Sequence, residues 1–77
     1  MTTIVRPLTR SEFARKMKIA RQVRGLTTTR LAELAQCSIA MISLMESGKR
    51  EGRYEMRARI AKVLGFQPYV LEWKVSV

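Results

Sequence analysis

The chain has no histidine and a single cysteine, Cys37. One cysteine cannot form an internal disulfide, and without histidine there is no metal-ligand cluster of the usual kind. The sequence also offers no paired carboxylates and no activated cysteine that could serve as base or nucleophile. We therefore expect no enzymatic activity, no metal and no cofactor, and we expect Cys37 to pack as a small hydrophobic side chain at a turn. A redox-sensing role would instead need a depressed thiol pKa in an exposed basic niche.

Acidic residues are also scarce. The chain has six acidic residues and 15 lysines and arginines, which gives a formal net charge of +9. A net charge this positive attracts polyanions, and nucleic acid is the first candidate. The alternative is that the cations have no polyanionic partner and only solvate the helix faces. There is no apolar run long enough to span a bilayer and no cleavable leader, so we expect a soluble, cytoplasmic protein without a membrane partner.

A chain of 77 residues has room for one small domain. A core of that size is marginal by itself, which favours association with a second copy. Hydrophobic periodicity and end signals predict four helices, over about 10–24, 28–35, 39–47 and 54–64. Thr9 and Glu12 fit a capping box at the first of them, with Ser11 as a rival cap. We expect Gly25 and Gly65 to end the first and the last helix.

Two of these helices are separated by only three residues, Gln36 to Ser38, which predicts a helix-turn-helix. Ala32 is small where the helices must cross closely, and the side chain of Ser38 can cap the second helix. The expected buried stripes are Leu31, Leu34 and Ala35 on one helix and Ile42 and Met45 on the next. Gly48 is the expected stop after them.

The tail differs from the rest of the chain, because residues 70–77 alternate between apolar and polar and so predict a β-strand. The chain offers only Ile4 and Val5 as an internal pairing partner. We expect the strand to pair antiparallel with its copy in a homodimer; a strand folded back on the N-terminus of a monomer is the alternative. The expected interface residues are Leu71, Trp73, Val75 and Val77. The predicted organisation is an extended arm at 1–8, a helix-turn-helix domain at 9–66 and a dimerisation strand at 67–77.

The segment 21–66 resembles the Cro/CI-type (XRE-like) helix-turn-helix regulators. The matching marks are Arg21, Gly25-Leu26-Thr27, Leu31-Ala32-Glu33, Ser38, Ile42-Ser43, Glu46 to Arg50, Ile60-Ala61-Lys62 and Leu64-Gly65. The N-terminal piece and the C-terminal strand are more loosely similar to HipB-type antitoxins and small phage repressors. The resemblance implies a mainly α, lambda-repressor-like bundle that binds operator DNA as a dimer, with the third helix in the major groove. It also implies a structural ion pair between Arg21 and Glu46.

Chemistry and the resemblance together suggest phosphate contacts at the start of the second helix and in the basic loop after the third, because amides, hydroxyls and cations suit phosphate oxygens. The candidates are Thr28, Arg30, Ser47, Lys49, Arg50 and Arg53. Other cations, which we assign to solvated helix surface or to the general field, are Lys16, Lys18, Arg57, Arg59 and Lys62.

The positions that the family uses to contact base edges are Ile39, Ala40, Ser43 and Leu44 here. Three of these four cannot form a side-chain hydrogen bond, so bidentate recognition of guanine or adenine is missing. Ile39, Ala40 and Leu44 could contact thymine methyl groups, while Ser43 and DNA shape add specificity. Alternatively, the apolar face could bind protein. Gln36 stands where the turn usually has glycine, so either it adopts a positive φ or the turn is reshaped.

The predicted function is that of a sequence-specific transcriptional regulator, a repressor of phage or toxin-antitoxin type, that binds a palindromic operator as a homodimer. The alternative is a protein-interaction adaptor, such as an antitoxin or phage-encoded inhibitor, that grips a toxin or other partner through the third helix or the tail strand.

Overall fold

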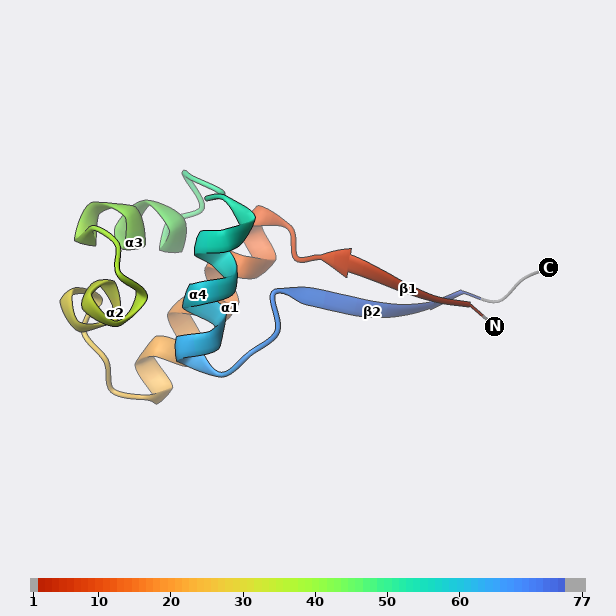
Figure 1. Ribbon diagram of the computed structural model, residues 1–77, viewed down its shortest axis with the longest axis horizontal. Coiled ribbons are helices and arrows are strands. Elements are labelled where there is room, and N and C mark those ends of the chain that lie inside the picture. Colours follow the sequence, from red (N-terminus) through yellow and green to blue (C-terminus); the bar gives the residue numbers. More distant parts are fainter. Residues whose placement is uncertain (1, 75–77) are drawn as a thin grey trace.

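The computed structural model describes residues 2–74. The elements, in chain order, are β1 (Thr2–Pro7), α1 (Arg10–Val23), α2 (Thr28–Ala35), α3 (Ile39–Glu46), α4 (Tyr54–Leu64) and β2 (Tyr69–Lys74). The four helices gather into one body, and the two strands leave it together as a ribbon (Figure 1). The ribbon makes the molecule long and narrow, with extents of 48 × 22 × 18 Å.

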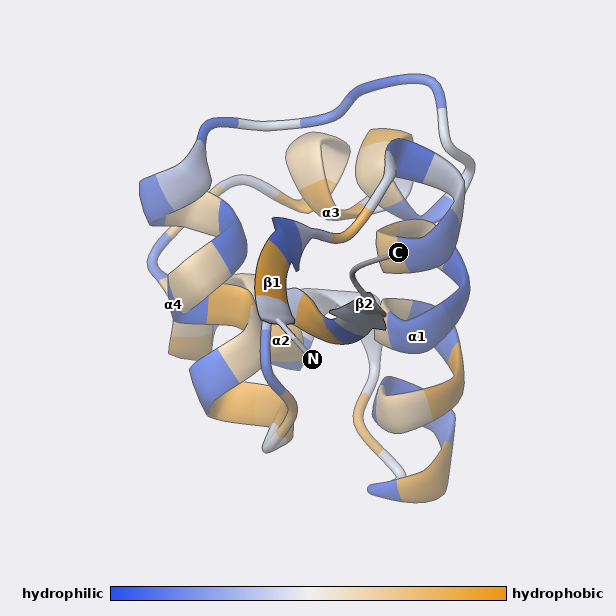
Figure 2. Ribbon diagram, turned by 90° about the vertical axis from the view of Figure 1, so that its right-hand side faces the viewer, coloured by the Kyte–Doolittle hydropathy of each residue, from blue (hydrophilic) through white to orange (hydrophobic). Residues whose placement is uncertain are grey.

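The core lies where α1 and α4 pack against α2 and α3. Its largest fully buried side chains are Phe13, Met17, Leu31, Ile42, Met45 and Ile60. Phe66, just after α4, closes one side of the core, with its ring 5.5 Å from that of Phe13 between centroids. Seen from the ribbon end, α1 and α4 stand on either side of the ribbon and α3 lies beyond it (Figure 2). α2 and α3 lie at the end of the body opposite to the ribbon (Figure 1).

The sequence predicted the four helices almost to the residue. The predicted bounds of α2 and α4 are confirmed, and α1 and α3 each end one residue earlier than expected. Thr9 and Glu12 form the capping box at α1, so the rival cap Ser11 is not used. One expected core residue is wrong: Leu34 is 40% exposed, because α2 buries only Leu31, Ala32 and Ala35.

The tail strand pairs within its own chain, which corrects the expectation that it pairs with its copy in a homodimer. β2 pairs antiparallel with β1 of the same chain, with Val5 opposite Leu71 and Thr3 opposite Trp73. The pairing expected with a second copy is therefore not needed to form the strand, because the N-terminal arm supplies the hydrogen-bonding partner. Val75 and Val77, two of the expected interface residues, lie outside the described residues.

An arginine clamp joins the ribbon to the helical body. The guanidinium of Arg6 in β1 donates to the Glu72 carboxylate in β2 and, at 2.9 Å, to that of Glu12 at the start of α1. The hydrogen bond from Arg6, together with that from the Thr9 N–H, lowers the pKa of Glu12 to about 2, so the Arg6–Glu12 pair stays ionised at neutral and mildly acidic pH. Leu8 then continues the pairing into the body, with its N–H donating to the Pro68 carbonyl at 3.1 Å.

Gln36 ends α2 in the left-handed region, with φ 58° and ψ 50°. Of the two expected outcomes for this position, the positive φ is the one observed. A side chain with a Cβ is strained there, because the Cβ approaches the following carbonyl oxygen. Gln36 is exposed, and within residues 2–74 its side chain forms no hydrogen bond that would offset the strain.

We expect Gln36→Gly to raise the free energy of unfolding by about 0.5–1 kcal/mol, since the relief of strain exceeds the added entropy of the unfolded chain. The melting temperature should rise by roughly 3–6 °C, measured by circular dichroism. The matched control is Gln22→Gly on the exposed face of α1, which should lower stability by about 1 kcal/mol. Equal losses in both variants would refute the strain at Gln36.

Candidate nucleic-acid interface

The corner between α2 and α3 is built by local hydrogen bonds. The Thr27 hydroxyl caps α2 by accepting from the Arg30 N–H at 3.0 Å, and the Ser38 hydroxyl caps α3 by accepting from the Met41 N–H at 3.1 Å. The Cys37 N–H donates back to the Ala32 carbonyl at 3.0 Å. The last two bonds lie at the corner itself, where they begin α3 and tie the turn back to α2, while α1 packs against α3 and α4 packs against α2.

α3 has one buried and one exposed side. Ile42 and Met45 point into the core and are fully buried. The four candidate base-contacting residues lie on the other side: Ile39 is 49% exposed, Ala40 and Ser43 are exposed, and Leu44 is half-buried. The structure thus brings them together on one accessible surface, of which only Ser43 is polar.

The start of α2 has free backbone donors. The first N–H groups of a helix have no partner within it, and they favour anions. The Thr27 cap takes the N–H of Arg30, which leaves the amide of Thr28 available. The side chain of Arg30 is already engaged, since it donates to Glu33 at 2.9 Å in an exposed pair. Arg30 is therefore the weaker of the two candidates in this element.

The loop after α3 folds back onto the end of that helix. The N–H groups of Lys49 and Arg50 both donate to the Leu44 carbonyl, at 3.0 and 3.2 Å. Both side chains are exposed, and neither they nor Arg53 forms a salt bridge with a carboxylate of residues 2–74. Arg50 and Arg53 line one surface hollow, which brings them together beside α3. Ser47 differs, because its hydroxyl donates to the Leu44 carbonyl at 3.0 Å.

Arg21 and Glu46 brace α1 against the end of α3. The guanidinium donates twice to the carboxylate, at 2.7 and 3.1 Å, and once to the Leu26 carbonyl at 2.8 Å. The two side chains are only 15% and 9% exposed. The carboxylate raises the pKa of Arg21 above its usual value, chiefly through these hydrogen bonds. The brace sets where the basic loop begins.

The structure places the side chain of Arg57 inside the fold, so its assignment to the solvated helix surface was wrong. It is 5% exposed and donates to the Leu8 carbonyl, with its guanidinium carbon 4.8 Å from the centre of the Phe13 ring. A weak contact of 3.6 Å reaches Glu51. Spacing could have revealed it, because Arg57 lies on the same helical face as Ile60, Ala61 and Leu64.

Cys37 is half-buried in the turn. Burial raises the pKa of its thiol despite the nearby charge of Arg59. A raised pKa disfavours the reactive thiolate, which agrees with a packing role. Within residues 2–74, histidine, cysteine and acidic side chains form no group of three that could hold a metal ion. No helix in that range is long and apolar enough to cross a membrane.

Two capped helices across a three-residue turn, inside a bundle that exposes the outer side of the second, define a helix-turn-helix protein. A family comparison matches residues 12–73 to the family described as "Helix-turn-helix domain". The match covers most of the chain, so the chain belongs to this family. This agrees with the resemblance to Cro/CI-type regulators drawn from the sequence.

Solved structures give the same result. Two crystal structures of the clp gene regulator ClgR from Corynebacterium glutamicum match at 30% sequence identity and a TM-score of 0.70, over 79% of this chain. The chain spans 65% of the length of one of these ClgR chains and 78% of the other. A comparison with curated proteins found no match.

Proposed function

We propose that this chain is a DNA-binding transcriptional regulator that places the exposed side of α3 in the major groove. The observation that carries the proposal is the combination of that exposed side with the cations of the 49–53 loop, whose backbone is bonded to the end of α3 and which have no salt bridge with a carboxylate of residues 2–74. Membership of the helix-turn-helix family and the similarity to a gene regulator support it.

The phosphate contacts would come from the start of α2 and from the loop after α3. The Thr27 cap leaves the amide of Thr28 available, and Lys49, Arg50 and Arg53 are exposed. Ser47 can accept from a bridging water but cannot donate to a phosphate while its hydroxyl is bonded to Leu44. Arg30 would need to leave Glu33, at a small cost for an exposed pair. Contacts of this kind fix register and supply salt-dependent affinity.

Base reading would rest on apolar contact. Ile39 and Ala40 can press on the C5 methyl groups of thymine, and Leu44 can support them from the half-buried edge. Ser43 is the one side chain of the four with a hydrogen-bonding group. The proposal therefore favours an operator rich in thymine at the contacted positions, with DNA shape supplying further specificity.

We further propose that two copies bind a palindromic operator and repress by occupying the promoter. The ribbon supports a homodimer, because Val5, Leu71 and Trp73 form one apolar face and are 62%, 56% and 69% exposed. A two-stranded ribbon is marginal alone and is stabilised by covering such a face. Half-sites would lie roughly 34 Å apart, one turn of the duplex.

The function is tested by selecting bound duplexes from a random pool. We expect a palindromic consensus, and we expect replacement of its thymines by deoxyuridine, which lacks only the C5 methyl, to weaken binding about tenfold per critical position. Thymines outside the α3 contacts serve as controls. No enrichment over random duplex at moderate salt would overturn the proposal, and stoichiometric capture of a protein through α3 would then favour the adaptor function.

The dimer has its own test. Trp73→Lys places a charge on the apolar face of the ribbon, so sedimentation should show a monomer where the parent is a dimer. Lys18→Ala, which changes an exposed residue of α1, should leave the association unchanged. An unaltered dimer in the Trp73→Lys variant would place the interface elsewhere.

A further inference from the structure

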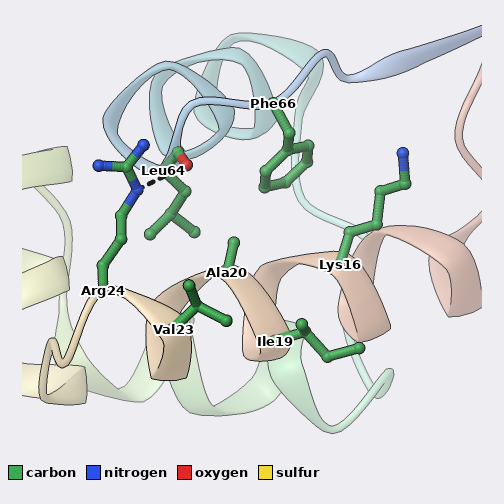
Figure 3. Close-up of a pocket in the computed structure, with 7 residues that line it drawn as sticks. All are labelled: Lys16, Ile19, Ala20, Val23, Arg24, Leu64 and Phe66. Atoms are coloured by element: carbon green, nitrogen blue, oxygen red, sulfur yellow. Dashed lines mark hydrogen bonds between the residues drawn. The ribbon is translucent and has the colours of Figure 1, made fainter.

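A second apolar surface lies on the helical body, apart from α3 and the ribbon. It is a groove of about 570 Å³ between α1 and the chain segment that follows α4 (Figure 3). Ile19 and Val23 form its α1 wall and are 54% and 81% exposed. Leu64 and Phe66 form the opposite wall, with Ala20 at the base. Ile19 and Val23 lie on adjacent turns of α1 and so form one contiguous apolar patch, which is typical of a contact surface.

Two cations stand at the ends of the groove. Lys16 on α1 and Arg24, the residue that caps its C-terminal end, are eight residues apart, which corresponds to about 12 Å along the helix axis. Arg24 is held in place because its Nε donates to the Leu64 carbonyl at 2.8 Å, across the end of α4. Lys16 reaches over the Phe66 end (Figure 3). Among the residues that the structure describes, 2–74, no carboxylate lines the groove.

The charges of the chain argue against a second copy as the occupant. All six acidic residues are glutamates, and five of them are already paired with arginines of the same chain: Glu12, Glu33, Glu46, Glu51 and Glu72. Only Glu55 is without such a salt bridge in the described part of the chain. A second copy would therefore bring an excess of +9 and almost no free carboxylate to Lys16 and Arg24.

We propose that this groove binds an acidic amphipathic helix of a partner protein. The apolar side chains of that helix would lie between Val23 and Phe66, and its carboxylates would meet Lys16 and Arg24. The length between the two cations matches about two helical turns, which suits a helix-in-groove contact with anchors at i, i+4 and i+7. The site is separate from the proposed DNA-binding surface, so a partner could bind while α3 remains accessible.

The test uses two labelled peptides of the same length, each with leucines at i, i+4 and i+7. One carries glutamate at the flanking positions and the other lysine. Fluorescence anisotropy with the full chain should show at least tenfold tighter binding of the glutamate peptide. Lys16→Glu should weaken the glutamate peptide and strengthen the lysine peptide, each about threefold. Equal binding of both peptides, or no binding of either, would overturn the proposal.

Val23→Ser should weaken the glutamate peptide about tenfold, because it removes apolar contact area in the groove. Val23 is too exposed for the change to affect folding, which thermal unfolding checks. The matched control is Val5→Ser on the ribbon, which should leave peptide affinity unchanged. If only Val5→Ser weakens the peptide, the occupant binds the ribbon. If Val23→Ser instead dissociates a dimer or weakens duplex binding, a second copy or DNA covers the groove; each of these results contradicts the proposal.

Discussion

Arg21→Met should lower the free energy of unfolding by about 3–5 kcal/mol, as expected when one partner of a buried ion pair is removed. Methionine retains most of the volume, so the loss is electrostatic. The Glu46 carboxylate, only 9% exposed, would lose the two hydrogen bonds it now accepts, and the Leu26 carbonyl would lose its donor. Urea denaturation followed by circular dichroism measures the change.

Two further variants separate this brace from ordinary surface charge. Arg30→Met breaks the pair with Glu33, in which both side chains are more than half exposed, and should cost less than about 0.5 kcal/mol. The double variant Arg21→Met/Glu46→Met should recover part of the loss, because no buried charge then remains unpaired. A loss in Arg21→Met no larger than in Arg30→Met would show that the brace does not act as a buried pair.

Much of the fold could be predicted because it is determined locally. The caps Thr9, Thr27 and Ser38 each accept from an N–H three residues further on, and such bonds depend only on neighbouring residues. Glycine after a helical pattern is equally local, as at Gly65. The position of the helix-turn-helix follows directly from these signals.

The wrong predictions concern contacts between distant residues. The tail strand reads as a strand from its alternation, but the sequence does not say that residues 2–7 lie beside it. Leu34 fits the apolar stripe of α2, yet α4 and α3 cover only the side that carries Leu31 and Ala35. Arg57 is charged and was assigned to solvent, whereas the carbonyl of Leu8, 49 residues away, supplies its partner.

The candidate site likewise has features that the sequence could predict and features that depend on contacts between distant residues. Periodicity predicted Ile42 and Met45 as the apolar stripe of α3. The resemblance to Cro/CI-type regulators supplied the four candidate base-contacting positions on the other side. The sequence did not predict the apolar groove on α1, since Ile19 and Val23 acquire an opposite wall only when Phe66 returns to α1. It also could not show that the hydroxyl of Ser47 is used within the chain.

Replacing Lys49, Arg50 and Arg53 together by alanine should weaken duplex binding about 500-fold at 0.1 M salt. Each phosphate contact contributes about 0.9 to the slope of log affinity against log salt, so the slope should fall by about 2.7. The effect should be the same for operator and random duplex, because phosphate contacts carry no sequence information. A filter or anisotropy titration over several salt concentrations measures both quantities.

The matched control is the triple alanine variant of Arg15, Lys18 and Lys62, which removes the same charge from exposed helix positions elsewhere. It lowers the general attraction to a polyanion but removes no proposed phosphate contact, so its slope should stay close to that of the parent. Deoxyuridine substitution in the operator should remain harmful in both variants, since it acts through Ile39 and Ala40. If the two triple variants give the same slope, binding depends on the net charge of +9 and not on a positioned loop.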